Sequence, residues 1–417
     1  MKILQFSCIV LTGFIFGFFS ASTAVAEETT SLRSLIEEAE KNNPKLTALR
    51  LHQEVAREEI TQAPFLDDPA LTLTQWGIPR GFNIGRSEET WLGVEQTFPY
   101  PGKRFLKREI ATIDWEIAKE EYQAKQLEVT AEIKSAYYNL FLITKTIDLH
   151  QEHQALLKEF IRIAETRYAV GHLSQQDLLK AEVELAKLHN GLMTLEQDRI
   201  STKAMINALL NRPDGHPMGK PEQVLYRPFL FLYDTITKEA INSKPDLKSA
   251  LFRVEKSESM KTLTKKDVLP DFMIGLSYLD VHGDENQWMA MGKINLPWVF
   301  GGKYDSKNRK AQLEADEARA SYDAVRNETI SKIKTIFTKI KTDEQLIDRY
   351  QNRLIPLAKQ SLTSAQIAYQ QGRGDFLNFI DSERTLLDLQ IEYHMKLTDY
   401  WQQVAALSPL VGKEINP

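Results

Sequence analysis

Residues 129–168 read VTAEIKSAYYNLFLITKTIDLHQEHQALLKEFIRIAETRY, and this stretch decides the fold. A set of mostly apolar positions starts at Val129 and recurs at alternating steps of four and three residues: Ile133, Ala136, Leu140, Ile143, Ile147, His150, Gln154, Leu157, Ile161, Ala164 and Tyr168. A sustained period of about 3.5 residues is typical of coiled-coil packing. Because residues 103–168 contain no proline or glycine, we predict one helix over about 103–170, roughly 100 Å long.

The chain also repeats itself at a spacing of about 200 residues, which points to a duplicated unit. The matching segments occur in the same order in both halves: Asn43-Pro-Lys-Leu46 with Lys244-Pro-Asp-Leu247, Gly102-Lys103 with Gly302-Lys303, and Tyr168-x-x-Gly171 with Tyr369-x-x-Gly372. Matches at one spacing across nearly the whole chain are hard to assign to chance. We therefore predict a tandem duplication.

Both repeats have the same predicted plan of a lead-in helix, two strands, a long helix and a return helix. The first repeat covers residues 27–212, with strands at about 69–77 and 89–98, the long helix at about 103–170 and the return helix at about 175–211. The second covers 236–417, with strands at about 270–280 and 287–296, the long helix at about 303–371 and the return helix at about 375–408. Residues 213–235 form a proline-rich connector, and Pro356 is expected to kink the second long helix.

Composition excludes several classes of function. The chain has 52 Lys and Arg against 57 Asp and Glu, so it lacks the basic field that nucleic acid requires. Its one cysteine, Cys8, excludes disulfide frameworks and cysteine-based zinc sites. No phosphate-binding loop, nucleophile elbow or His-Glu-x-x-His motif is present. We expect neither an enzyme nor a bound cofactor.

The N-terminal residues 1–26 indicate export. Lys2 precedes an apolar run that ends in small residues at Ala26, the pattern of a cleaved secretory signal. Cys8 lies too early in the run to carry a lipid, so we expect no lipid anchor. Beyond Ala26 the sequence offers no apolar stretch of about 18 residues. An exported chain of this kind is either soluble or crosses a membrane as strands.

The predicted strands alternate apolar and polar residues over lengths that can span a bilayer at a tilt. Leu92, Val94 and Phe98 alternate with Gly93 and Thr97, for example. Four strands cannot close a barrel, and an open sheet edge is not tolerated in lipid. If these strands enter a membrane, several copies must combine them. The alternative is a pair of soluble hairpins packed on the helices.

This plan resembles the TolC-type outer-membrane efflux channel family. The likeness rests on segments that precede the long helices and on segments at their far ends: Gln96-Thr-Phe-Pro-Tyr-Pro-Gly-Lys103, Asn295-Leu-Pro-Trp-Val-Phe-Gly-Gly-Lys303, Arg167-Tyr-Ala-Val-Gly171 and Ala368-Tyr-Gln-Gln-Gly372. It covers almost the whole chain after residue 26. The sequence Pro-x-Pro-Gly-Lys at Pro99 to Lys103 is most similar to that of the heavy-metal cation branch of the family.

The resemblance implies a mainly α fold with a small β part, in which helices form an α-helical barrel and trimerisation completes a 12-stranded β-barrel. It implies a passive homotrimeric conduit in the outer membrane with a long periplasmic extension. The partners would be a periplasmic adaptor (membrane fusion protein) and an inner-membrane pump of the RND type. The alternatives are a drug-efflux or protein-secretion duct of the same fold, or a soluble periplasmic coiled-coil adaptor or scaffold.

The resemblance also identifies candidate gate residues. Carboxylates on the second return helix ring the closed entrance in the family, and the matching positions here are Asn378 and Asp381. The family contact that holds the tip closed matches Tyr369 with Asp177. In the family an arginine also takes part in this contact. In this chain Gly374 occupies the arginine position, and Arg373 is adjacent to it.

We expect adaptor contact at the turns that end the long helices. These residues are Val170, Gly171, His172, Leu173, Ser174, Gln371, Gly372 and Gly374, together with Arg373. His150 and His153 are one helical turn apart, but no third ligand accompanies them in the sequence, and His150 falls on the apolar stripe. We therefore expect no specific metal site, and conduction itself requires weak binding.

Overall fold

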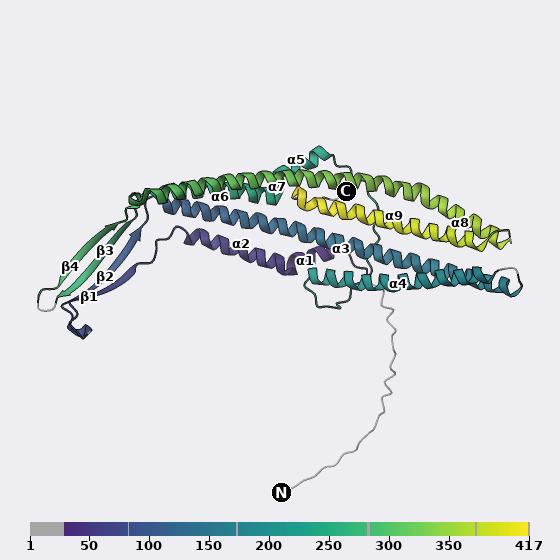
Figure 1. Ribbon diagram of the computed structural model, residues 1–417, viewed down its shortest axis with the longest axis horizontal. Helices are drawn as coiled ribbons and strands as arrows, with labels where there is room; N and C mark the ends of the chain where they lie inside the picture. The colour runs from purple at the N-terminus through teal and green to yellow at the C-terminus, as the bar shows by residue number, and fades with distance from the viewer. Residues whose placement is uncertain (1–28, 82, 172–173, 282–283, 372, 416–417) are drawn as a thin grey trace, which may run out of the picture.

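The computed structural model describes residues 29–81, 83–171, 174–281, 284–371 and 373–415. The molecule is long and narrow, with a small β-sheet at one end and helices along the remaining length (Figure 1). Two helical hairpins turn back at the end opposite the sheet. The predicted signal segment, residues 1–26, lies outside the described residues.

Each repeat begins with two helices, where the sequence predicted a single lead-in helix. They are α1 (Leu32–Asn42) and α2 (Pro44–Gln62) in the first repeat, and α5 (Tyr233–Ser243) and α6 (Pro245–Lys266) in the second. The prediction was wrong because proline disfavours the helical conformation in the residue before it. Asn43 and Lys244 accordingly have extended backbones, with ψ of 123° and 122°. Each proline then begins the following helix, a position it favours.

The first long helix, α3 (Lys103–Ala169), is unbroken over 67 residues. Its heptad positions form a buried seam, in which Ile133 and Leu140 are fully buried and Ile147 nearly so. They pack against neighbours on several sides, since α3 contacts α2, α4, α6 and α9. Burial of this apolar stripe, at about 25 cal/mol per Å² of surface removed from water, stabilises a helix far longer than its own propensity would support.

The second long helix is interrupted. Helix α7 (Gly301–Arg349) passes into a π-helical turn, η3 (Tyr350–Leu354), before α8 (Ile355–Gln370). The turn lies directly before Pro356, the residue that the sequence predicted to kink this helix. Proline has no N–H, and its ring clashes with the carbonyl four residues earlier. That carbonyl belongs to Asn352, inside the turn, so the wider π turn accommodates the proline.

The return helices are α4 (Gln175–Leu209) and α9 (Phe376–Val411). Helix α4 packs on α3, whereas α9 packs on α3, α7 and α8. Residues 210–232, between α4 and α5, form neither helix nor strand apart from one isolated bridge between Thr30 and Pro221. This connector crosses the middle of the molecule, where its Phe229 is 1% exposed and its backbone N–H donates to Glu344 Oε1 at 2.7 Å.

The described residues contain one antiparallel sheet, in the order β1 (Ala70–Trp76), β2 (Glu89–Phe98), β3 (Phe272–Val281) and β4 (Gln287–Ile294). Short 3₁₀ turns lie at Ile84–Arg86 and Pro297–Phe300. The pairing of β2 with β3 joins the first repeat to the second.

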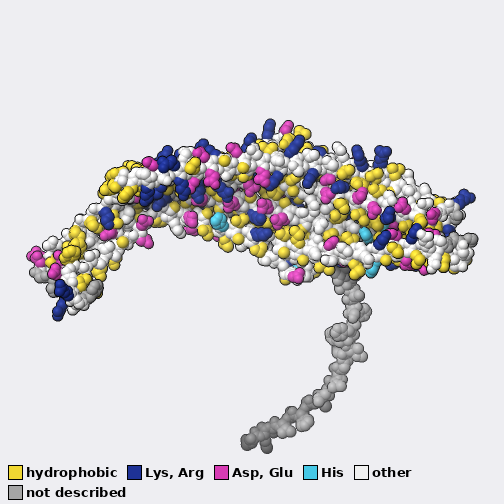
Figure 2. All heavy atoms as spheres, viewed as in Figure 1, with side chains coloured by type: hydrophobic (Ala, Val, Ile, Leu, Met, Phe, Trp, Pro, Cys, Tyr) yellow, Lys and Arg dark blue, Asp and Glu magenta, His cyan; other side chains and the backbone are white. Residues whose placement is uncertain are grey.

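The register places apolar side chains on one face of the sheet. Leu73 lies opposite Leu92, Leu92 opposite Tyr278, and Tyr278 opposite Trp288. Directly paired residues share a face, and these four side chains are between 37% and 70% exposed. Figure 2 shows apolar side chains gathered over this end of the molecule. On the opposite face, the Ser277 and Thr72 side chains leave no room for a Cβ at Gly93.

Among the described residues, no helix combines the length and apolar composition needed to cross a membrane.

Candidate functional site: the helical tips

The two hairpin tips lie next to each other at the end of the molecule opposite the sheet (Figure 1). In the first tip, Ser174 caps α4: its Oγ accepts from the Asp177 N–H at 3.2 Å and donates to Asp177 Oδ2 at 2.7 Å. In the second tip, Asp375 caps α9 by accepting from the Leu377 N–H at 3.2 Å. Such caps satisfy amides that have no partner at the start of a helix.

Glycines allow the chain to reverse at both tips. Gly171 has a left-handed φ of 77°, and its N–H donates to Tyr168 O at 3.0 Å. Gly374 is required for another reason, because an added Cβ would lie 2.9 Å from the backbone nitrogen of Tyr369. Of the residues predicted for adaptor contact, His172, Leu173 and Gly372 lie outside the described residues.

The remaining predicted contact residues mostly face outward. Val170 is 64% exposed, and Gly171, Ser174, Gln371 and Arg373 are exposed as well. The outward position of Val170 leaves an apolar side chain in water at the turn.

An apolar cluster joins the two hairpins directly behind the tips. Its buried members are Leu157, Phe160, Ile161, Ala164, Ala181, Tyr369, Phe376 and Phe379. The rings of Phe160 and Phe379 stack with centroids 3.9 Å apart and an interplanar angle of 28°. Because Phe160 belongs to α3 and Phe379 to α9, this cluster fixes the first hairpin against the second.

Tyr369 lies at the centre of the cluster, where its closest charged neighbour is Arg167. The guanidinium carbon lies 4.5 Å from the Tyr369 ring centre, and the group donates to Tyr369 O at 2.8 Å and Gln370 O at 3.0 Å. Burial raises the pKa of Tyr369; the Arg167 charge opposes this rise and the Asp177 charge adds to it.

The structure places Asp177 near Tyr369 without joining them by a hydrogen bond. Within the described residues the buried Tyr369 hydroxyl has no hydrogen bond of ordinary geometry, and the Asp177 carboxylate accepts from Ser174 instead. Arg373, which lies beside the expected arginine position, has an exposed side chain. The arginine at this site is therefore Arg167, which the quoted tip motif contains but to which sequence reasoning gave no role.

Asn378 and Asp381 lie together on one wall of a groove between α4 and α9. The groove has a volume of about 830 Å³. The Asp381 side chain is 71% exposed and receives one contact from Arg384 Nη2 at 3.3 Å. The walls carry both signs of charge on apolar surroundings: Gln175, Gln176, Leu179, Lys180, Val183, Glu184, Lys187, Leu377, Asn378, Ile380, Asp381 and Arg384. An exposed carboxylate here can meet a passing cation without a large desolvation cost.

A buried polar cluster links α3 to α9 about one helical turn away from the tip cluster. His153 Nδ1 lies 2.5 Å from Glu383 Oε1, and its Nε2 lies 3.3 Å from Gln390 Oε1. The side chains of His153 and Glu383 are only 7% and 6% exposed. Burial lowers the pKa of His153, but the hydrogen bond and charge of Glu383 outweigh that effect, so the pKa is raised overall. Below this raised pKa the two groups form an internal ion pair.

His150, one turn from His153, faces a different helix. An added Cβ on Gly191 of α4 would lie 3.2 Å from His150 Cε1. Burial, with the nearby His153 charge, lowers the pKa of His150. No cluster of three or more His, Cys, Asp or Glu in the described part of the chain could hold a metal ion.

Known proteins match this chain over most of its length. The sequence model of the family described as "Outer membrane efflux protein" matches residues 35–212 and again residues 236–413. The two matches fall on the two predicted repeats, so the tandem duplication is confirmed, and the resemblance to this type of channel is confirmed with it.

Among characterised relatives, the cobalt-zinc-cadmium resistance protein CzcC of Cupriavidus metallidurans is 20% identical over 75% of this chain and 74% of its own length. Two crystal structures share the fold. The outer membrane protein VceC of Vibrio cholerae superposes with a TM-score of 0.77 at 18% identity, covering 92% of this chain and 96% of VceC. The CmeC channel of Campylobacter jejuni gives 0.78 at 17% identity, covering 91% and 85%.

Proposed function

Because the chain belongs to the outer membrane efflux protein family, whose members are outer-membrane channels, we propose that three copies form the passive exit duct of a tripartite efflux system. A periplasmic adaptor would contact the helical tips, and an inner-membrane pump, of the RND type, would supply the energy. The duct itself performs no reaction.

The feature that carries the trimer proposal is the sheet. One of its faces is apolar and exposed, and within the described residues its outer strands β1 and β4 each pair on one side only. Unpaired backbone groups are costly in lipid. Three copies supply twelve strands, and each β4 can then pair with β1 of the next copy, so that no edge remains.

We propose heavy-metal cations as the cargo. Two observations support this class: the similarity to CzcC, a cobalt-zinc-cadmium resistance protein, and the exposed carboxylate of Asp381 in the groove beside the tips. In a trimer, three Asp381 side chains around one axis would attract cations and repel anions. The Arg167 and Tyr369 contact would hold the tips of one copy together.

Two experiments test these proposals. Deleting the gene is expected to sensitise cells to cobalt, zinc or cadmium more than to a panel of drugs; the reverse order would contradict the metal cargo. In planar bilayers, Asp381→Asn is expected to lower cation selectivity. Asp375→Asn is the matched control, because it removes the same charge at the same tip and asparagine still caps α9. Equal selectivity of the two variants would exclude Asp381 from the constriction.

A further inference from the structure

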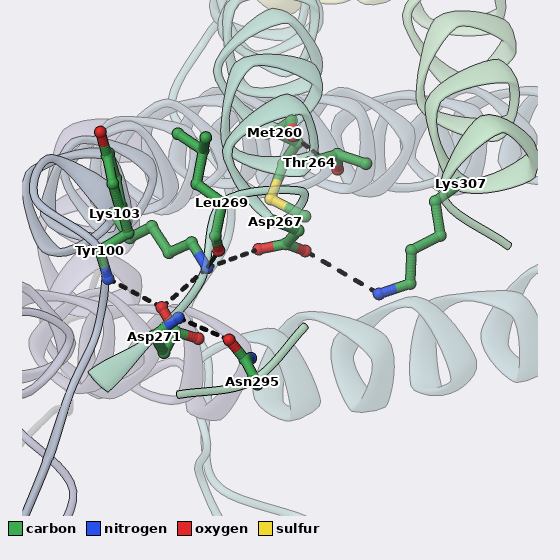
Figure 3. Close-up of polar contacts among 9 residues, drawn as sticks. All are labelled: Tyr100, Lys103, Met260, Thr264, Asp267, Leu269, Asp271, Asn295 and Lys307. Atoms are coloured by element: carbon green, nitrogen blue, oxygen red, sulfur yellow. Dashed lines mark hydrogen bonds and ion pairs between the residues drawn. The ribbon is translucent and has the colours of Figure 1, made fainter. Parts of the chain in front are cut away.

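A network of polar contacts joins the first repeat to the second where the sheet meets the helices (Figure 3). Lys103 begins α3, and its side chain is only 7% exposed. Its Nζ lies 2.9 Å from Asp271 Oδ1 and 3.8 Å from Asp267 Oδ1, and it also donates to Leu269 O at 3.3 Å. Asp271 Oδ1 also accepts from the Tyr100 N–H at 2.8 Å. This network fixes the start of α3 against the linker between α6 and β3.

The linker is held in place from its own repeat as well. Asn295, just after β4, accepts from the Asp271 N–H at 2.7 Å. The first repeat contains a related contact in the opposite direction, because the Gln96 side chain near the end of β2 donates to Asp67 O at 2.8 Å. In each repeat, one side-chain hydrogen bond therefore holds the linker before the first strand against the end of the second strand.

The second copy of the junction lacks its partner inside the chain. Lys303 takes the place of Lys103 near the start of the second long helix, nine residues after the end of β4, whereas Lys103 lies five residues after the end of β2. Lys303 is exposed, and no carboxylate of the described residues forms an ion pair with it. Asp67 and Asp68 are exposed too, and neither forms an ion pair in that part of the chain. Over its described ranges, the chain thus contains an unpaired lysine in the second repeat and two unpaired carboxylates in the first. They lie on opposite outer sides of the subunit, away from the junction between its repeats.

Charge and apolar exposure on these two outer sides are complementary. Residues 58–68 contain four acidic residues and no basic one, whereas residues 301–310 contain four basic residues and one acidic one. Of these four basic residues, Lys307 forms an ion pair with Asp267 and Lys310 forms one with Glu314. Trp298, Val299 and Phe300 are 53%, 60% and 72% exposed beside Lys303. On the other side, Phe65 beside Asp67 is 67% exposed. Large exposed apolar groups next to opposite charges are typical of surfaces that another protein covers.

We propose that Lys303 of one copy binds the carboxylates of Asp67 and Asp68 of the next copy, forming between copies the contact that Lys103 forms with Asp271 and Asp267 within one. The partner is a second copy of this chain because the internal junction shows which repeat faces which: the start of a long helix meets the linker of the following repeat. After the second repeat, the following repeat belongs to another copy. This inference rests on the proposed trimer and adds the residues that align its subunits.

Thiol cross-linking provides the test. In a chain with Cys8→Ser, which removes the one natural cysteine, Lys303→Cys is combined with Asp68→Cys and treated with a short bis-maleimide. We expect covalent dimers and trimers on a denaturing gel. The matched control combines Lys103→Cys with Asp271→Cys, which should cross-link within one chain and leave only monomers. A trimer by light scattering in detergent that gives no ladder would overturn this inference alone, whereas a monomer would overturn the proposed function as well.

Charge reversal tests the same contact without relying on the thiol pair. Lys303→Asp is expected to lower the temperature at which the trimer dissociates in detergent. Adding Asp67→Lys and Asp68→Lys should restore that temperature. If Lys303→Asp leaves the dissociation temperature unchanged, or if the reversed pair gives no recovery, Lys303 does not bind these carboxylates.

Discussion

The two long helices occupy equivalent places in the two repeats, yet their surroundings differ. Near the sheet, α3 contacts both α2 and α6, whereas among the described lead-in helices α7 contacts α5 and α6. Ile113 of α3 is half-buried, while Leu313 of α7 is 68% exposed. In a duplicated chain, the two repeats cover each other at one internal junction. The corresponding surface on the outer side of each repeat has no partner within the same chain. The exposed face of α7 is therefore the surface that a neighbouring copy would cover.

The largest expected effect comes from breaking the buried ion pair that only one of the two interfaces contains. At the equivalent positions in the other repeat, Leu354 replaces His153 and Glu182 replaces Glu383. His153→Ala leaves the Glu383 charge buried without its partner, so we expect a loss of about 3–5 kcal/mol in the free energy of unfolding. Urea unfolding in detergent, followed by circular dichroism, measures it.

The pH dependence of this pair has a defined sign. Because the pKa of His153 is raised in the folded state, its stabilisation is complete below the unfolded value and is lost as pH rises through the raised pKa. The double variant His153→Leu with Glu383→Leu should be close to neutral in stability and should lack this loss. A double variant as unstable as His153→Ala would show that the loss comes from packing rather than from the unpaired charge.

The next largest effect on stability comes from comparing a buried leucine of α3 with an exposed leucine of α7. Leu140 of α3 is fully buried and Leu313 of α7 is exposed. Leu140→Ala should therefore destabilise the folded chain by about 2–5 kcal/mol, whereas Leu313→Ala should change the unfolding free energy of the subunit by about 0.5 kcal/mol or less. If Leu313 lies between copies, its variant should instead lower the dissociation temperature of the trimer. No change in that temperature would mean that this face of α7 stays exposed to water.

The dependence of stability on acidic pH should differ between the buried His394 and the exposed equivalent position in the first repeat. Burial, aided by the Lys145 charge, lowers the pKa of His394 from 6.5 to about 4. As pH falls between these values the unfolded chain takes up a proton that the folded chain does not, so stability falls by up to about 1.4 kcal/mol per pH unit. His394→Phe should flatten this slope. The equivalent residue in the first repeat, Met193, is 63% exposed, so Met193→His should add no slope; an added slope would contradict the assignment.

The smallest effect is expected at the tips. The Tyr369 hydroxyl is buried without a hydrogen bond of ordinary geometry among the described residues, whereas Arg167 donates to the backbone carbonyls of Tyr369 and Gln370. Tyr369→Phe should thus change the unfolding free energy by about 0.5 kcal/mol or less, while Arg167→Ala should cost about 1 kcal/mol or more. A larger loss for Tyr369→Phe than for Arg167→Ala would restore the contact between Tyr369 and Asp177 suggested by the family.

Periodicity and repetition predicted much of this fold because both can be read directly from the order of the residues. The α3 seam and the four strands follow from steps of 3.5 and two residues. The breaks before Pro44 and Pro245 were also readable, since the residue before proline is restricted, but the helical pattern continues across them. The π turn before Pro356 could not be read, because a proline is accommodated by a kink, a break or a wider turn according to its packing.

The candidate site was less predictable because its contacts join distant segments. His153 and Glu383 are separated by 230 residues, and the heptad pattern places neighbours on one helix without naming the residue across the interface. Arg167 instead of Arg373 approaches Tyr369 because the hairpins lie side by side, which no spacing within one repeat encodes. Asp381 lies in the groove between α4 and α9, and its role as a gate stays a proposal.

The pairing of β2 with β3 has a kinetic consequence. Each chain can complete this seam alone, in a first-order step whose rate does not depend on dilution. In the proposed trimer, the seams at β1 and β4 would require an encounter between chains and would form more slowly at lower chain concentration. Newly made subunits should therefore form the four-stranded sheet quickly as monomers. These monomers would keep their apolar strands exposed until their local concentration is high enough for assembly.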